Sequence, residues 1–137
     1  MDVLITGEAR RDIEALEILA PKAQAWGFLL GHKRGFRFIV EQAFAAGERA
    51  AVPSVERLHA LDALWGGRLL GLYAIYPAPA VRRAAAAPYF CGRLFLDIRR
   101  GRGRARQSVL RPFVVEFDGR FRLTPTALRP GPKGGPP

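Results

Sequence analysis

Two segments of the chain place apolar residues at helical spacing, with charged residues on the opposite side. The first covers about residues 9–20 and stops at Pro21, because a proline disfavours helical backbone at the residue before it. The second covers about residues 54–65, where Ser54 can cap the first turn. Both segments are predicted to be amphipathic helices that bury one side against a sheet.

Apolar runs and turn signals predict the strands of that sheet. Residues 69–76 form an uninterrupted apolar run, which is typical of a central strand covered on both faces. The run stops at Pro77, which lacks a backbone donor. Asp118-Gly119 is a two-residue hairpin signal between two further runs. The predicted strands are 3–6, 25–32, 36–44, 69–76, 89–98, 109–117 and 120–123.

This order of elements predicts an α+β fold. We expect a mixed, mostly antiparallel β-sheet flanked by the two amphipathic helices, with a β-hairpin added at the C-terminal end. A length of 137 residues is enough for one domain, which we expect to cover residues 1–127. Residues 77–88 are interpreted as a loop, and the Gly- and Pro-rich residues 128–137 as a disordered tail.

Two strand motifs and their spacing carry a family resemblance. Residues 26–31 (WGFLLG), after the first helix, are similar to a strand of the pattern glycine, hydrophobic, leucine, hydrophobic, glycine. Residues 70–77 (LGLYAIYP), after the second helix, are similar to a strand that ends in Gly-Trp-Tyr-His-Ser-His-Pro. Over roughly residues 1–98 the chain therefore resembles the JAMM/MPN (Mov34-type) domain, the fold of zinc isopeptidases that remove ubiquitin-like tags.

The resemblance implies that the zinc site of this family has been lost. Active members hold Zn²⁺ with two histidines and an aspartate, a glutamate acts as the general base, and a serine lies in the loop before the aspartate. Carried over residue by residue, these positions hold Gln24, Ala74, Tyr76, Ala84 and Ala87. An alanine side chain cannot bind zinc, and an amide cannot accept a proton as a carboxylate does. The resemblance thus implies a pseudoenzyme without metal or cofactor, which acts as a protein-interaction or dimerisation module.

Positive charge is concentrated in the last third of the chain. Residues 1–98 hold 12 Lys and Arg against 10 Asp and Glu, whereas residues 99–137 hold 10 against 2, which accounts for +8 of the net charge of +10. The segment 99–106 spaces its arginines with Gly and Ala and has no aromatic residue between them. Arginine forks match phosphate groups, although a solvated basic loop is the alternative interpretation. The candidate residues for an anionic partner are Arg99, Arg100, Arg102, Arg104 and Arg106.

Few other residues could carry chemistry. Cys91 has apolar neighbours, which predicts a buried side chain in a reducing, cytoplasmic protein. His32 and His59 are the only histidines, and His59 is expected to hydrogen-bond along its own helix, close to Asp62. No apolar run reaches the ~20 residues that span a bilayer, so no membrane partner is expected.

The sequence leaves three functions open. The first is a catalytically inactive JAMM/MPN-like domain that binds a protein partner or a second copy of itself. The second is a nucleic-acid-associated protein that binds phosphates through the segment 99–106. The third is a hydrolase whose chemistry does not match a motif in this chain.

Overall fold

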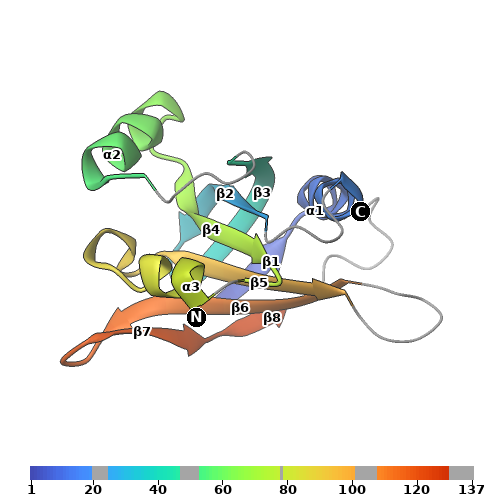
Figure 1. Cartoon of the computed structure of the whole chain (residues 1–137). Coiled ribbons are helices and arrows are strands. Elements are labelled where there is room, and N and C mark those ends of the chain that lie inside the picture. Colours follow the sequence, from blue (N-terminus) through green and yellow to red (C-terminus); the bar gives the residue numbers. More distant parts are fainter. Residues whose placement is uncertain (20–24, 47–52, 78, 101–107, 130–137) are drawn as a thin grey trace.

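Eight strands form one mixed sheet that curls until its two edges approach each other (Figure 1). The computed structural model describes residues 1–19, 25–46, 53–77, 79–100 and 108–129. The strands follow the order β7-β6-β5-β4-β2-β3-β1-β8 across the sheet. Their bounds are β1 Asp2–Ile5, β2 Trp26–Arg34, β3 Arg37–Ala45, β4 Leu69–Ile75, β5 Leu94–Arg100, β6 Ser108–Phe117, β7 Phe121–Pro125 and β8 Ala127–Arg129.

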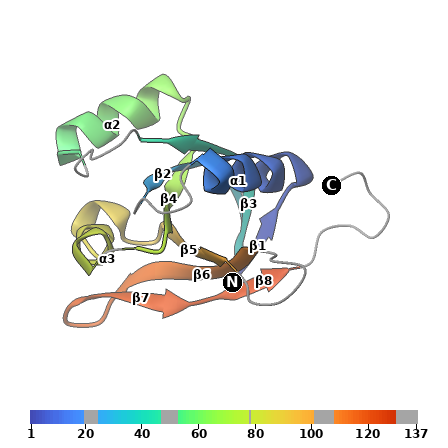
Figure 2. The same ribbon diagram turned by 45° about the vertical axis from the view of Figure 1, so that its right-hand side comes forward.

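Helices cover both faces of this sheet (Figure 2). The α-helices are α1 Gly7–Leu19, α2 Val55–Leu64 and α3 Pro79–Ala85, and a 3-10 turn covers Pro88–Phe90. Ala9 and Ile13 of α1 pack into one apolar cluster, whereas Leu58 of α2 and Ala85 of α3 pack into a second cluster on the other face. The central strand β4 is buried along its whole length, as the uninterrupted apolar run predicts. No helix within the described residues is both long and apolar enough to cross a membrane.

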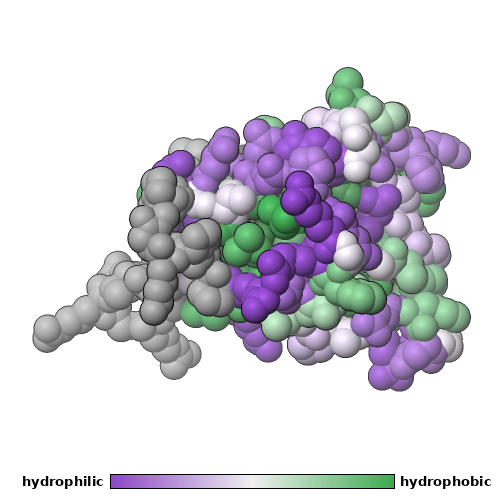
Figure 3. All heavy atoms as spheres, turned by 180° about the vertical axis from the view of Figure 1, so that it is seen from behind, coloured by the Kyte–Doolittle hydropathy of each residue, from purple (hydrophilic) through white to green (hydrophobic). Residues whose placement is uncertain are grey.

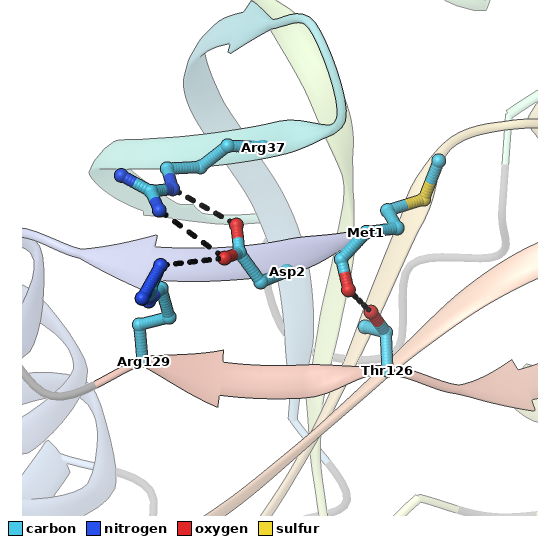
Figure 4. Close-up of polar contacts among 5 residues, drawn as sticks. All are labelled: Met1, Asp2, Arg37, Thr126 and Arg129. Atoms are coloured by element: carbon cyan, nitrogen blue, oxygen red, sulfur yellow. Dashed lines mark hydrogen bonds and ion pairs between the residues drawn. The ribbon is translucent and has the colours of Figure 1, made fainter.

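One stretch of chain, residues 121–129, links the two edges of the sheet. β7 pairs antiparallel with β6, β8 pairs parallel with β1, and only Thr126 separates β7 from β8. The backbone N–H of Thr126 donates to the carbonyl of Pro112 in β6 at 3.0 Å. Its hydroxyl donates to the carbonyl of Met1 at 2.8 Å (Figure 4). The chain thus leaves one edge strand and continues along the other, which nearly closes the sheet into a barrel.

An ion cluster holds this closure together (Figure 4). Asp2 of β1 accepts hydrogen bonds from Nε of Arg37 at 2.9 Å and from Nη2 of Arg37 at 3.3 Å. Nη1 of Arg129 donates to the same carboxylate at 3.3 Å. Since Arg37 belongs to β3 and Arg129 to β8, one carboxylate joins three neighbouring strands. The hydrogen bond from Arg37 is the main cause that lowers the pKa of Asp2 below its ordinary value, and the positive charges of both arginines add to this effect.

The fold class predicted from the sequence is wrong. The structure has a nearly closed, barrel-like sheet with three α-helices, in place of a mostly antiparallel sheet flanked by two. Among the seven strand pairings of the described residues, β1–β3, β1–β8 and β4–β5 are parallel. The pairings that close the sheet join the two ends of the chain. Local apolar patterns do not report such contacts, because they reflect only which face of each element is buried.

The third helix lies in the segment that the sequence analysis interprets as a loop. Pro79 is the first residue of α3, where its missing N–H would have no helical partner in any case. Alanine and arginine, which make up most of α3, have high helix propensity. A seven-residue helix is too short to show helical periodicity, so the two flanking prolines suggested a loop instead.

Two residues of the expected tail belong to a strand. Leu128 and Arg129, the first two residues of that tail, belong to β8 and pair with Val3 and Leu4. Residues 130–137 lie outside the described part of the chain. The order of strand, helix, hairpin, helix and further strands is confirmed, as is the cap on α2, where the Ser54 side chain accepts from the Arg57 N–H.

Glycines allow the central strands to approach one another closely. A Cβ atom on Gly71 of β4 would lie 1.7 Å from the carbonyl oxygen of Leu94 in β5. A Cβ on Gly27 or Gly31 of β2 would lie 2.0 Å or 1.9 Å from a carbonyl oxygen of β3. The register of β2 also shifts next to Leu30 against both of its neighbours. Irregularities of this kind increase the local twist that a curled sheet needs.

The contact at Gly71 predicts a large effect of a single methyl group. Gly71→Ala is expected to lower the free energy of unfolding by about 2–4 kcal/mol, because β5 must move away to make room. Urea denaturation measures the difference. The control is Gly35→Asn in the β2–β3 turn, where φ is 56° and the space is open, and where asparagine tolerates the left-handed backbone. A Gly71→Ala protein as stable as the control would contradict the close packing of β4 and β5.

The ion cluster of Asp2 predicts a pH-dependent contribution to stability. Because the pKa of Asp2 is lowered on folding, the cluster stabilises the fold above the ordinary carboxyl pKa of 3.8 and loses this contribution as the pH falls through the lower folded value. Asp2→Asn should therefore be less stable than the wild type at about pH 7, and the difference should disappear by about pH 2. Chemical denaturation at both pH values tests this, with Glu14→Gln on the exposed side of α1 as the control. An equal loss of stability at both pH values would contradict a stabilising role for the ionised carboxylate of Asp2.

Candidate functional site

β4 and β5 are parallel neighbours in the middle of the sheet, so their C-terminal ends lie side by side. Ala74 near the end of β4 is paired in register with Asp97 of β5. Just beyond β4, the backbone N–H of Tyr76 donates to the carbonyl of Ile98 at 2.9 Å. The loops that follow parallel strands commonly hold the binding residues of a domain. The candidate site therefore lies at the C-terminal ends of β4 and β5.

Asp97 is a buried carboxylate in an otherwise apolar stretch of β5. Its side chain is 1% exposed, and an ionised carboxyl group at such a place requires charged hydrogen-bond partners. Nη1 of Arg82, from α3, donates to it at 2.9 Å. Arg99 donates through Nε at 3.1 Å and through Nη2 at 3.4 Å. The hydrogen bond to Asp97 is also the main cause that raises the pKa of Arg99.

Two aromatic rings lie beneath these arginines. The guanidinium carbon of Arg82 is 5.8 Å from the ring centroid of Phe95 and 5.3 Å from that of Phe113. The guanidinium carbon of Arg111 is 5.9 Å from the Phe113 ring. Phe95 pairs with Phe113 across β5 and β6, and Asp97 pairs with Arg111 in the same way. Cations are attracted to ring faces at these distances, so the rings help to fix where the arginine heads lie.

The cluster carries an excess of positive charge. Arg82, Arg99 and Arg111 supply three positive charges against the single negative charge of Asp97, which leaves two uncompensated. Arg111 forms no ion pair with any carboxylate in the described part of the chain. The side chains of Arg82 and Arg99 are 35% and 47% exposed, so both can reach a ligand while they hold Asp97. This arrangement is suited to binding an anion.

Tyr76 stands at the edge of the cluster in an unusual conformation. Its φ is 48°, and no other non-glycine residue of the described ranges has a positive φ. The residue is 42% exposed, and its backbone lies beside Ile98, the residue before Arg99. A bulky residue in the left-handed region costs about 1–3 kcal/mol and is found most often at functional sites.

The structure describes only part of the basic segment proposed from the sequence. Arg99 is exposed and bonded to Asp97, and Arg100 is the last residue of β5, where it pairs with Ser108. The other three candidates for an anionic partner lie outside the described residues; they are Arg102, Arg104 and Arg106.

Sequence reasoning missed two residues of the cluster, Arg82 and Asp97, although a signal existed for both. Asp97 is the only acid in the apolar stretch 94–98, and Arg82 and Arg83 are the only charged residues of the segment 77–88.

The positions that correspond to the JAMM zinc site do not supply ligands. Ala74 is buried in β4 and Tyr76 follows it, whereas Ala84 lies in α3 and Ala87 precedes the 3-10 turn. Gln24 lies outside the described residues. Over the described ranges, no group of three or more His, Cys, Asp or Glu side chains is arranged so that it could hold a metal ion.

Cys91 and the histidines behave differently from what the sequence predicts. Cys91 is exposed, because it follows the 3-10 turn rather than lying inside a strand. The ring of His59 packs edge-on against Tyr89, with 5.0 Å between ring centroids. Asp62, its expected partner, instead accepts a hydrogen bond from the Leu69 N–H at 3.0 Å. His32 bonds to Glu41 on the neighbouring strand β3.

Comparison with known proteins shows the fold but not the function. No family model and no curated protein matches the sequence. Among solved structures, the chain is similar to the solution structure of protein DSY2949 from Desulfitobacterium hafniense, with 17% identity and a TM-score of 0.59. The alignment covers 98% of this chain and 97% of that protein. The two proteins therefore share a fold over their whole length, and the resemblance to the JAMM/MPN family stays a prediction.

The buried carboxylate predicts a test of the cluster itself. Asp97→Asn is expected to lower the free energy of unfolding by about 1–3 kcal/mol, because Arg82 and Arg99 lose their charged partner and the amide cannot accept all of their hydrogen bonds. Glu116→Gln, an exposed position on the adjacent strand β6, is the matched control and should change stability by less than about 0.5 kcal/mol. Urea denaturation that finds both variants equally stable would contradict the role of Asp97 as the anchor of the two arginines.

Proposed function

We propose that the protein binds nucleic acid through its phosphate groups at the cluster formed by Arg82, Arg99 and Arg111. The observation that carries this proposal is that Arg82 of α3 and Arg99 of β5 converge on one buried carboxylate, while Arg111 of β6 lies opposite that carboxylate's residue in the strand register and shares the Phe113 ring with Arg82. Arginine is the side chain best matched to phosphate, since its planar fork can donate two parallel hydrogen bonds.

The bonds to Asp97 support the proposal because they hold the arginines in place without using all of their donors. Asp97 accepts one hydrogen bond from Arg82 and two from Arg99. A guanidinium group has more N–H donors than these bonds occupy, and both side chains remain partly exposed. Side chains that are already ordered lose less conformational entropy when a ligand binds.

The distribution of charge along the chain supports the same function. Residues 99–137 contribute +8 of the net charge of +10, and the segment 101–107 that joins β5 to β6 contains three arginines. Positive charge on one part of a surface attracts polyanions and speeds their association. Two of the three arginines of the cluster, Arg99 and Arg111, lie on the strands that this segment connects.

Salt-dependent binding tests the proposal. We expect labelled single-stranded DNA and RNA to bind in fluorescence anisotropy, with an affinity that falls steeply as salt is added. Replacing Arg82, Arg99 and Arg111 together by Gln should weaken binding by about tenfold or more and reduce the slope of log affinity against log salt by about 2. Replacing Arg34, Arg57 and Arg120 by Gln removes the same charge at other exposed sites and should have a smaller effect.

Two further variants separate binding from folding. Arg111→Gln leaves the hydrogen bonds of Arg82 and Arg99 to Asp97 intact, so it should weaken binding while thermal unfolding stays unchanged. A variant in which Arg102, Arg104 and Arg106 become Gln measures how much of the binding affinity depends on the segment 99–106. The proposal is wrong if neither DNA nor RNA binds at low salt, or if the matched control loses as much affinity as the cluster variant.

A protein-interaction or dimerisation module is the second candidate. Large apolar side chains are exposed around α2, where Leu64 is 77% and Phe44 44% exposed, and Phe44 stacks on Trp65. In Figure 3 apolar groups project from the side of the molecule on which α2 lies. Light scattering of the same samples tests self-association, and a monomer mass at all concentrations would exclude the dimer. With either candidate we propose a non-enzymatic, cytoplasmic protein; the hydrolase alternative stays a prediction.

A further inference from the structure

We infer that Tyr76 stacks on an unpaired base, so that the nucleic acid bound at the arginine cluster is single-stranded. This inference rests on the proposed function, and it adds the form of the ligand. The basic segment 99–106 contains no aromatic residue on which a base could stack. The fold supplies one from elsewhere in the sequence, because Tyr76 follows β4, the parallel neighbour of β5.

Among the aromatic residues of this site, Tyr76 is the accessible one. Phe95 is 0% and Phe113 7% exposed, so their rings serve the core and the arginines above them. Tyr76 is 42% exposed, and its backbone N–H bonds to the carbonyl of Ile98, the residue before Arg99. A base on the tyrosine ring would thus have its phosphate within reach of arginines. An aromatic ring beside basic side chains is the usual platform for single strands.

The backbone of Tyr76 supports a functional role for its side chain. A glycine would adopt a φ of 48° without strain, yet the position holds a bulky aromatic residue. The hydrogen bond from the Tyr76 N–H to Ile98 holds this conformation, and Pro77 directs the chain away from the strand. Strain of this kind persists only where the surrounding structure holds it, and it clusters at functional sites.

The form of the ligand follows from the chemistry of stacking. In a duplex the faces of the bases are stacked on one another and are not available to a protein side chain, whereas an unpaired base can be turned out. Stacking on an aromatic ring contributes about 1–3 kcal/mol per base and depends little on sequence. Arginine contacts alone would bind a duplex, a single strand and a polymer without bases on the basis of charge.

Three probes distinguish these ligands. They are a labelled oligothymidylate of about 12 nucleotides, a duplex DNA of the same length, and inorganic polyphosphate as a competitor that has no bases. The wild type should bind the single strand about tenfold more tightly than the duplex at equal salt, and polyphosphate should compete weakly per phosphate. Tyr76→Phe keeps the ring and should retain this preference.

Tyr76→Asn is the informative variant. Asparagine tolerates the left-handed backbone, so the fold should be retained, and the change leaves every arginine in place. The preference for the single strand should disappear, while the affinity for polyphosphate stays within about twofold of the wild type. A wild type that binds all three probes alike, or a Tyr76→Asn protein that keeps the preference, overturns this inference and leaves phosphate binding intact. Failure of the wild type to bind any of the probes overturns the proposed function as well.

Discussion

Closure of the sheet is the constraint on which the rest of the structure depends. An open sheet of this size would leave two edges with unpaired backbone donors and acceptors, a condition that proteins avoid. Here the stretch 121–129 pairs first with β6 and then with β1. Between the two pairings, Thr126 donates hydrogen bonds to the carbonyls of Pro112 and Met1. The Asp2 carboxylate then joins β1 to β3 and β8 through Arg37 and Arg129. Together these contacts hold a curvature that close packing at the glycines of β2 and β4 makes possible.

The candidate site follows from the same architecture. Because β4 and β5 are parallel neighbours at the centre of the sheet, residues after β4 lie beside residues at the end of β5. Asp97 is buried there, and a buried carboxylate is stable only when charged donors satisfy it. It therefore fixes Arg82 and Arg99, which come from different elements, next to the position of Arg111. An acid in the interior thus creates an ordered basic surface, and Tyr76 provides an aromatic side chain at its edge.

Local interactions were the part of the fold that the sequence could predict. The cap at Ser54, the hairpin at 26–45 and the buried run at 69–75 depend on neighbouring residues or on the periodicity of apolar side chains, and all three are present. α3 escaped detection because seven residues are too few for a helical period and prolines enclose them. Cys91 was expected to be buried from its apolar neighbours, but those neighbours belong to a turn and a strand that face the core while Cys91 does not.

The sequence by itself determined the type of most elements and the basic character of the last third of the chain. Only the tertiary structure decided that the sheet closes, and that Arg82 and Asp97 meet beside Tyr76. The physical reason is the range of the interactions. Helix caps and strand periodicity act over a few residues, whereas the pairing of β1 with β8 joins positions more than a hundred residues apart. A buried charge finds its partners only after the elements have packed.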